Sequence, residues 1–243
     1  VLREEKPGFI AAVLMNSANL FSSIIYIIRT GTTDSLPGII SYSGVILIIA
    51  LINNYKNKKT AYIDRINSQK KNLVESEKKL YQMAYYDSLT ELPNKDLFFD
   101  LLNQSILVAK RNVSLIGVMF IDFDSFKSVN DIGGHAVGDK VLQKVANLIS
   151  SCLREEDTIA RFGGDEFLIK VANIEKIDNL YKTTDRILDA FKKPIVVQDI
   201  EYFITASIGV AVYPVDGEDP ETLVKNADIA MYLAKEKGKN QSV

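Results

Sequence analysis

Two long apolar stretches dominate the first 55 residues of the chain. Asp, Glu, Lys, Arg and His are absent from Pro7 to Ile28 and again from Ser35 to Tyr55. Each stretch has about the length that a helix needs to cross the roughly 30 Å hydrocarbon layer of a membrane. The connection over 29–34 is too short to carry soluble structure. We predict two transmembrane helices in the lipid bilayer, at about 9–28 and 36–54; the alternative is a pair of buried helices in a soluble sensor.

The charges that flank the second apolar stretch predict its orientation. Basic side chains follow it closely, at Lys56, Lys58, Lys59 and Arg65, whereas the short connection holds only Arg29 and Asp34. Because cytoplasmic flanks of membrane spans are rich in Lys and Arg, we expect the C-terminal portion to be cytoplasmic. A signal peptide fits poorly, because two spans are present and no small-residue cleavage pattern stands out.

The segment 56–85 is charged and contains neither Gly nor Pro, which predicts a continuous helical connector. Ile66, Leu73 and Leu80 recur every seven residues, while the complementary positions are mostly polar. This pattern favours a weak parallel coiled coil, and a solvated single helix is the alternative.

Beyond residue 85 the hydrophobic period switches repeatedly between that of a helix and that of a strand. We predict helices over 94–110, 125–132, 137–153, 176–191 and 219–238. We predict strands over 113–122, 158–161, 166–171, 195–197 and 202–213. This order suggests an α+β fold of the ferredoxin-like type, with a βαββαβ core.

Composition narrows the classes of function. The chain has 243 residues, 47% of them hydrophobic, and a formal net charge of −2. It therefore lacks the broad basic field of nucleic-acid binders, and we expect no nucleic-acid partner. A single cysteine, Cys152, excludes an intramolecular disulfide, and His135 alone cannot build a zinc site. The first residue is Val1 rather than Met, which suggests that an upstream part is missing.

The segment Arg161–Phe167 carries the strongest chemical signal, because Gly163-Gly164 leads directly into Asp165-Glu166. Flanking apolar residues predict a hairpin with these four residues at its tip. Glycines allow a tight turn and a close approach of a ligand, and carboxylates are ligands that Mg²⁺ prefers. Asp122 ends a predicted central strand, so it can converge with this pair if the strands are neighbours. Such a cluster needs one or two Mg²⁺ ions to offset its own repulsion.

Four motifs occur in one order along the chain. They are Asp87-Ser88-Leu89-Thr90-Glu91-Leu92-Pro93-Asn94, the run from Asp122 to Asp139, the glycine turn, and Ala227-Asp228-Ile229-Ala230-Met231-Tyr232-Leu233-Ala234-Lys235. Together they resemble the GGDEF domain of diguanylate cyclases, over roughly Tyr86 to Asn240. We assign 86–243 to this domain, and the family's palm-like fold agrees with the predicted core.

The resemblance implies roles for the acidic residues. Asp122 and the backbone carbonyl of Phe123 would ligate metal, and Asp165 would be both ligand and base. Glu166 would support the metal or the substrate. The cofactor implied is Mg²⁺ or Mn²⁺, with two ions per active site.

The resemblance also implies a set of substrate contacts. Lys127, near a helix N-terminus that attracts anions, would contact phosphate and stabilise the transition state. The guanine readers would be Asn130 and Asp139, with His135 close to substrate in the loop between Gly134 and Gly138, and Gly163 and Gly164 at the turn. Lys235 and Lys239, four apart on the last helix, would face the terminal phosphates. The family commonly has arginine at Lys239 and at Lys95, and lysine lacks arginine's bidentate fork.

Arg154 and Asp157 match the family's Arg-x-x-Asp inhibitory site for the dimeric product. An arginine fork and an aspartate suit guanine and phosphate. An ordinary solvated helix end is the alternative reading of these charges.

We therefore expect a diguanylate cyclase that condenses two GTP into cyclic di-GMP and two pyrophosphates in a homodimer. Cyclic di-GMP would be both product and inhibitor, and the enzyme would be a multi-pass protein of the bacterial inner membrane. One alternative is a catalytically weak GTP-binding regulatory GGDEF module of a larger cyclic di-GMP signalling protein. Another is a membrane-tethered dimerisation unit that does not bind GTP.

Overall fold

The computed structural model describes residues 5–243, with side chains from residue 8 onward. Both predicted membrane helices lie within the described residues, and only residues 1–4 of the predicted region 1–55 lie outside them. The chain divides into two compact units, with the boundary between Glu77 and Lys78. The predicted domain limits at residues 55 and 85 stay predictions.

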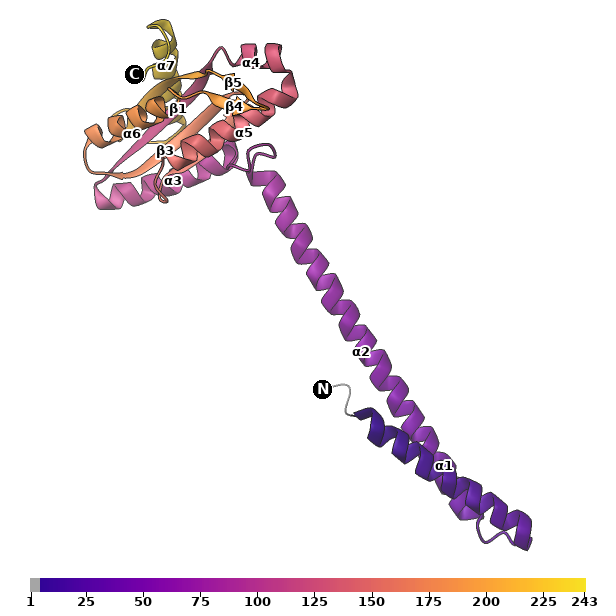
Figure 1. Ribbon diagram of the computed structural model, residues 1–243. Coiled ribbons are helices and arrows are strands. Elements are labelled where there is room, and N and C mark those ends of the chain that lie inside the picture. Colours follow the sequence, from indigo (N-terminus) through magenta and orange to yellow (C-terminus); the bar gives the residue numbers. More distant parts are fainter. Residues whose placement is uncertain (1–4) are drawn as a thin grey trace. The chain divides into compact units, whose positions relative to one another are not determined.

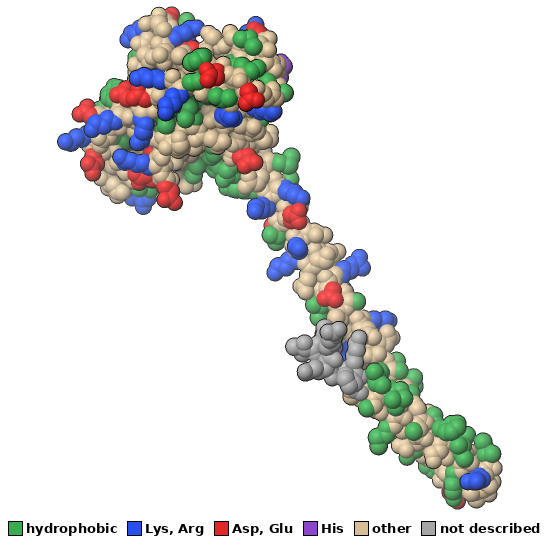
Figure 2. Space-filling model, in the orientation of Figure 1, with side chains coloured by type: hydrophobic (Ala, Val, Ile, Leu, Met, Phe, Trp, Pro, Cys, Tyr) green, Lys and Arg blue, Asp and Glu red, His purple; other side chains and the backbone are tan. Residues whose placement is uncertain are grey.

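The N-terminal unit consists of two helices. α1 spans Glu5–Thr30, and α2 spans Leu36–Tyr85 without interruption, so the second apolar stretch and the charged connector form one helix of 50 residues (Figure 1). Both helices contain a stretch that is long and apolar enough to cross a membrane, and none of its residues is buried. Apolar side chains are frequent along α1 and the first half of α2, and charged side chains appear farther along α2 (Figure 2). Length and composition alone are weak evidence for a membrane anchor.

The heptad positions of the connector are open to solvent. Ile66, Leu73 and Leu80 are 44%, 60% and 63% exposed. Such a row has no partner within the described part of this single chain, and the coiled coil stays a prediction.

The C-terminal unit is built on a four-stranded antiparallel sheet with the order β2-β3-β1-β6. The strands are β1 (Leu115–Asp124), β2 (Thr158–Gly163), β3 (Glu166–Ile174) and β6 (Thr205–Tyr213). The helices are α3 (Lys95–Asn112), α4 (Phe126–Gly133), α5 (His135–Ser151), α6 (Ile177–Ala190) and α7 (Pro220–Glu236). With α4 and α5 after β1, and α6 after β3, this is the predicted βαββαβ order.

Both faces of the sheet are covered by helices (Figure 1). Side chains of a strand alternate between the two faces, so β1 can contribute to two cores. Met119 and Ile121 belong to the core beneath α4, α5 and α6. Val118 and Phe120 belong to the core beneath α3 and α7. The apolar run in the sequence is continuous because β1 is buried on both sides.

The predicted strand over 202–213 is wrong in one respect, since the chain breaks it at residues 203–204. β5 (Ile200–Tyr202) pairs with β4 (Ile195–Val197) in a separate two-stranded sheet, and β6 starts at Thr205. The Asp124 carboxylate fixes this start, because it accepts hydrogen bonds from the hydroxyls of Thr205 (2.7 Å) and Ser207 (2.8 Å). A run of apolar residues cannot show where a strand changes sheets.

The predicted strand over 113–122 is shifted by two residues, because Val113 caps α3 instead. Its backbone is left-handed (φ 53°), its N–H is directed to the Ala109 carbonyl, and its side chain is 93% exposed. A β-branched residue is strained in this conformation, which glycine adopts freely.

Replacing Val113 with glycine is expected to stabilise the C-terminal unit by roughly 1 kcal/mol, since the strain of a left-handed L-residue costs about that much. The melting temperature should rise by about 2–4 °C for a chain of this size. Val113→Ala, which keeps a Cβ, is the matched control and should give a smaller change. Equal melting temperatures for all three chains would contradict the strain.

Candidate functional site

Strand pairing places two of the predicted acidic residues opposite each other. In the antiparallel ladder of β1 and β3, Asp122 and Glu166 are Cα partners. Phe120 and Leu168 lie two positions from Asp122 and Glu166 on the same strands, and both belong to the core beneath α3 and α7. Because side chains alternate along a strand, Asp122 and Glu166 project from that same face of the sheet. Directly opposed residues have Cβ atoms about 5 Å apart, so the two carboxylates share one patch of surface.

The glycine turn closes the hairpin beside these carboxylates. Gly163 pairs with Glu166, which leaves Gly164 and Asp165 as the loop, and Gly164 has a positive φ of 53°. Apart from the adjacent residues, a Cβ added at Gly163 or Gly164 would meet no atom of the described residues within 4 Å. The fold itself therefore leaves room in front of this backbone, where a ligand can approach closely.

Burial and like charge act together on the acidic patch. Burial raises the pKa of Asp122, as does the charge of Asp165, while the Lys235 ammonium opposes the rise. Burial likewise raises the pKa of Glu166, with further contributions from Asp122, Asp165 and Asp228. These carboxyl groups are held close enough to repel one another, which is a common property of functional sites.

Lys235 partly relieves this repulsion. Its Nζ lies 2.7 Å from Asp122 Oδ1, and both side chains are mostly shielded from solvent. α7 can bring Lys235 this close because Gly209 on β6 has no side chain. A Cβ there would collide with the Ala227 carbonyl and the Met231 amide of α7.

The donors present fit a hard divalent cation. In the described part of the chain, no three His, Cys, Asp or Glu side chains form a ready-made metal cage. Mg²⁺ usually takes one or two carboxylates and completes its shell with water and substrate phosphates, so such a cage is not required. The carboxylates of Asp122 and Glu166 repel each other and so attract such an ion, and the Lys235 ammonium on Asp122 offsets their charge only in part.

Comparisons with known proteins identify the family of the C-terminal unit. The sequence profile described as "Diguanylate cyclase, GGDEF domain" matches residues 84–241. The chain belongs to this family. Of its curated relatives, the bifunctional diguanylate cyclase/cyclic di-GMP phosphodiesterase MucR of Pseudomonas aeruginosa is 37% identical over 81% of this chain. The diguanylate cyclase TpbB of the same species is 38% identical over 72% of it.

The chain spans 28% of MucR and 40% of TpbB, so it corresponds to a part of each relative. Among solved structures, the coiled coil and GGDEF domain of DgcB from Caulobacter crescentus, in complex with c-di-GMP, has a TM-score of 0.68. That similarity covers 75% of this chain and 97% of the solved one, at 27% identity. The GGDEF fold and the link to cyclic di-GMP signalling are thereby confirmed.

One arginine, which sequence reasoning did not single out, holds the GGDEF turn in place. Arg161 Nε and Nη2 donate to the Gly164 carbonyl at 3.0 and 2.7 Å. Its Nη1 donates to both carboxylate oxygens of Asp87 at 3.1 Å. Burial alone would raise the pKa of Asp87, but hydrogen bonds from Thr90 and the Arg161 guanidinium outweigh it and lower the pKa. Arg161 thus ties the turn to the motif that begins the GGDEF domain.

Asp124 is a second residue that sequence reasoning missed. Besides accepting from the two hydroxyls of β6, its carboxylate accepts a hydrogen bond from the backbone N–H of Asn240 at 3.1 Å. Asp124 is therefore bound by its own fold, which separates it in role from Asp122. The motif Asp122-Phe123-Asp124 gave no sign of this difference.

The predicted guanine readers lie on α4 and α5. Asn130 is half-buried on α4, and Asp139 is exposed on α5. Gly138 packs against Asn130 so closely that a Cβ would collide with the Asn130 Oδ1 atom. Lys127 is exposed in the first turn of α4. The predicted loop position of His135 is wrong, because His135 is the exposed first residue of α5, after Gly134 (φ 77°).

The inferred common helix face of Lys235 and Lys239 is also wrong. α7 ends at Glu236, and Lys239 lies in the following turn with a φ of 65°. Gly238, with a φ of 121°, redirects the chain between them. Lys95, at the other departure from the family pattern, lies 4.7 Å from the centroid of the Phe162 ring in a cation–π contact. The substrate roles of all these residues stay predictions.

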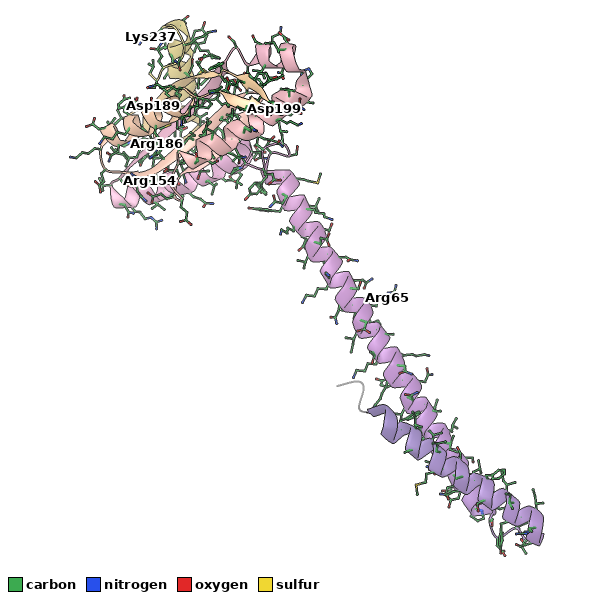
Figure 3. The ribbon with its side chains drawn as sticks, viewed as in Figure 1. Arg65, Arg154, Arg186, Asp189, Asp199 and Lys237 are labelled. Atoms are coloured by element: carbon green, nitrogen blue, oxygen red, sulfur yellow. The ribbon has the colours of Figure 1, made fainter. Side chains whose placement is uncertain are left out.

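The predicted inhibitory pair adopts a tight local turn. The Asp157 carboxylate accepts hydrogen bonds from the amides of Arg154 (2.9 Å) and Ala172 (3.3 Å). The Arg154 side chain, labelled in Figure 3, is 64% exposed and lies 3.7 Å from Glu156. Arg154 is therefore accessible to a ligand, whereas Asp157 already stabilises the backbone. Inhibition by product stays a prediction.

Proposed function

We propose that this chain is a diguanylate cyclase. The observation that carries the proposal is the opposition of Asp122 and Glu166 across β1 and β3, beside a glycine turn with open space in front of it. Substrate phosphates need cations and an uncrowded backbone. The two carboxylates of this patch would hold the cation, and the glycine turn leaves the backbone open. The relatives support the reaction class, since TpbB is named a diguanylate cyclase.

Each residue has a defined task in this proposal. Asp165 accepts the proton of the attacking 3′-hydroxyl, while Asp122, the Phe123 carbonyl and Glu166 hold the metal side of the site. Lys127 and Lys235 neutralise phosphate charge, and Asn130 and Asp139 read guanine. Mg²⁺, when bound, offsets the negative charge that develops on the transferring phosphoryl group.

The product requires two active sites to meet. One GTP bound to each subunit of an antiparallel homodimer places each 3′-hydroxyl against the α-phosphate of the other nucleotide. Each attack forms one phosphodiester bond and releases one pyrophosphate, so two GTP give cyclic di-GMP and two pyrophosphates. The exposed heptad residues of α2 suit the parallel pairing that would bring two such domains together.

The test is GTP turnover by the purified 243-residue chain in the presence of Mg²⁺, with cyclic di-GMP and pyrophosphate both quantified. Asp165→Ala is the control for the chemistry. Equal product from the wild type and this variant would remove the catalytic role from the turn.

Replacing Gly138 with alanine is expected to raise the KM for GTP about tenfold, since the new Cβ displaces the Asn130 amide that we assign to guanine. The kcat should change less than the KM. Gly134→Ala is a poor control because of its positive φ, so Ala136→Gly on the exposed side of α5 serves instead. An unchanged KM in Gly138→Ala would contradict the role of Asn130.

A GTP-binding regulatory module is the second candidate. Two observations favour it: lysine replaces the family's arginine at residues 95 and 239, and MucR, of which this chain spans 28%, is named as bifunctional. The same assay separates the two functions. Saturable GTP binding without pyrophosphate release would establish the regulator, and absence of GTP binding would leave a dimerisation unit.

We further propose that α1 and α2 anchor the protein in the bacterial inner membrane, with the GGDEF domain in the cytoplasm. Unburied apolar side chains over both helices support this, as do the lysines that follow the second stretch. With Cys152→Ala as background, Thr33→Cys should react with an impermeant maleimide added to cells. Ser76→Cys should react only after the inner membrane is permeabilised. The reverse pattern would invert the topology.

A further inference from the structure

A second pocket lies away from the GGDEF turn, between α3 and the strands β1 and β3. Its volume is about 360 Å³, and Leu101, Val108 and Ile116 contribute apolar walls. Small-molecule sites have volumes of about 300–1,000 Å³ and combine apolar walls with a few polar groups. None of its lining residues belongs to the catalytic assignment above.

The most unusual lining residue is Lys170 on β3. It points to the same sheet face as the core residue Leu168, and only 7% of its surface is exposed. Its Nζ donates a hydrogen bond to Ser105 Oγ on α3 at 3.1 Å. Burying an ammonium is costly unless it is paired, and one neutral hydroxyl compensates it poorly. Within the described residues, Ser105 Oγ is the hydrogen-bond acceptor of this ammonium. Its remaining N–H groups are available to a further acceptor.

Burial lowers the pKa of Lys170, and the charge of Asp157 opposes this only in part. The Asp157 carboxylate accepts hydrogen bonds from two backbone amides, and within the described residues it forms no hydrogen bond or ion pair with Lys170. An anion placed in the pocket would accept a hydrogen bond directly from this ammonium, as no carboxylate of the described residues does.

A second polar group supports the same conclusion. The hydroxyl oxygen of Ser114, which also lines the pocket, is buried and has no hydrogen-bond partner within the described part of the chain. A buried hydroxyl without a partner costs about 1–3 kcal/mol. Lys170 and Ser114 thus have hydrogen-bond donors without acceptors among the described residues at one cavity. The two oxygens of a carboxylate would accept hydrogen bonds from both.

We propose that this pocket binds a small aromatic or branched aliphatic monocarboxylate. The carboxylate would accept hydrogen bonds from Lys170 and Ser114, with the apolar body against Leu101 and Val108. Glu156, also at the pocket, repels anions, so a second carboxylate on the ligand should weaken binding further. This site goes beyond the proposed cyclase reaction and does not depend on it.

Its position links the pocket to the GGDEF turn. Lys170 and Glu166 lie on the same face of β3, and four residues of strand span about 13 Å. α3, which supplies Ser105, begins at Lys95. Lys95 lines a different pocket, beside the GGDEF turn, together with Phe162 and Gly163 at the end of β2. A ligand that shifts α3 would therefore move Lys95 relative to the GGDEF turn.

The test is calorimetric titration of the purified 243-residue chain with benzoate, corrected by titration into protein-free detergent. Benzoate is expected to bind saturably with one site per chain, whereas benzyl alcohol and phthalate should bind at least about tenfold more weakly. Lys170→Met, which keeps an apolar stem, should weaken benzoate about tenfold or more, and Ser114→Ala a few-fold. Lys193→Met, at an exposed lysine, is the matched control and should bind like the wild type.

A variant that retains Lys170 guards against a general folding defect. Ala172→Phe fills the pocket from its lining and should abolish benzoate binding, while the melting temperature shows that the chain remains folded. Absence of saturable benzoate binding to the wild type would overturn the proposal, as would equal affinity in Lys170→Met. GTP turnover is not used in these measurements, so the two proposals can fail separately.

Discussion

Asp122→Asn is expected to lower cyclic di-GMP formation by roughly a thousandfold, in line with the loss of a principal electrostatic group in an active site. Asparagine has nearly the same shape, so the hydrogen bond to Lys235 can persist. The charge that attracts a divalent cation is lost, however, and Glu166 is left without its partner across the ladder. The measurement is initial-rate product formation at saturating GTP and Mg²⁺.

Asp178→Asn, an exposed aspartate in the first turn of α6, is the matched control and should keep wild-type turnover. Comparable loss in both variants would point to charge in general rather than to the site. Retention of activity in Asp122→Asn would remove this residue from the proposed metal ligands.

The raised pKa values of Asp122 and Glu166 also predict a pH dependence. Their contribution to stability is fully present below the ordinary values of 3.8 and 4.5, and it is lost as pH rises through the raised folded-state values. In metal-free buffer, Glu166→Gln should therefore be more stable than the wild type at neutral pH, and the difference should vanish on acidification. The exposed Glu175→Gln should show no such trend in urea unfolding curves.

Local patterns were sufficient to predict most of the fold. The two-sided burial of β1 appears in the sequence as an uninterrupted apolar run. The glycine pair marks the hairpin because Gly164 has a positive φ of 53°, which glycine adopts without strain. Asn94, predicted to cap α3, does so by accepting a hydrogen bond from the Leu97 amide at 3.0 Å. Such features depend on neighbours in sequence.

Features that depend on distant residues were not predictable in this way. Arg161 and Asp87 are separated by 74 positions, and Asp124 and Ser207 by 83. Only the final strand order brings them together, so nothing in the local pattern distinguishes Asp124 from Asp122. The break between β5 and β6 has the same origin, because the Asp124 contacts decide where β6 begins. Lys239 was misplaced because α7 ends at Glu236, and the positive φ angles of Gly238 and Lys239 turn the chain away from the helix axis.

The Arg161 clamp provides the sharpest test of how the turn is held. Arg161→Lys is expected to lower turnover by about 10- to 100-fold, since the misplacement of catalytic groups by about 1 Å is costly. A lysine ammonium cannot reach the Gly164 carbonyl and both Asp87 oxygens together as the planar guanidinium does. The variant should also lose roughly 2–3 kcal/mol of stability, because Asp87 is left partly buried with a weaker partner.

The pH dependence of that loss has a definite sign. The lowered pKa of Asp87 means that its stabilising contribution is present above the ordinary value of 3.8 and is lost as pH falls through the lower folded-state value. The stability difference between the wild type and Arg161→Lys should therefore shrink in acid. A double-mutant cycle with Asp87→Asn isolates the interaction between the two side chains.

A surface ion pair in the same domain supplies the control. Lys192 Nζ lies 2.6 Å from Asp189 Oδ1 (Asp189 is labelled in Figure 3), which is shorter than the 3.1 Å contact of Arg161 with Asp87. Those side chains are 77% and 65% exposed, against 14% and 21% for Arg161 and Asp87. Solvent screening should make the cost of Lys192→Met much smaller than that of Arg161→Lys, with turnover unchanged. If the two pairs prove equally important, distance rather than burial controls their strength, and the clamp loses its special role at the turn.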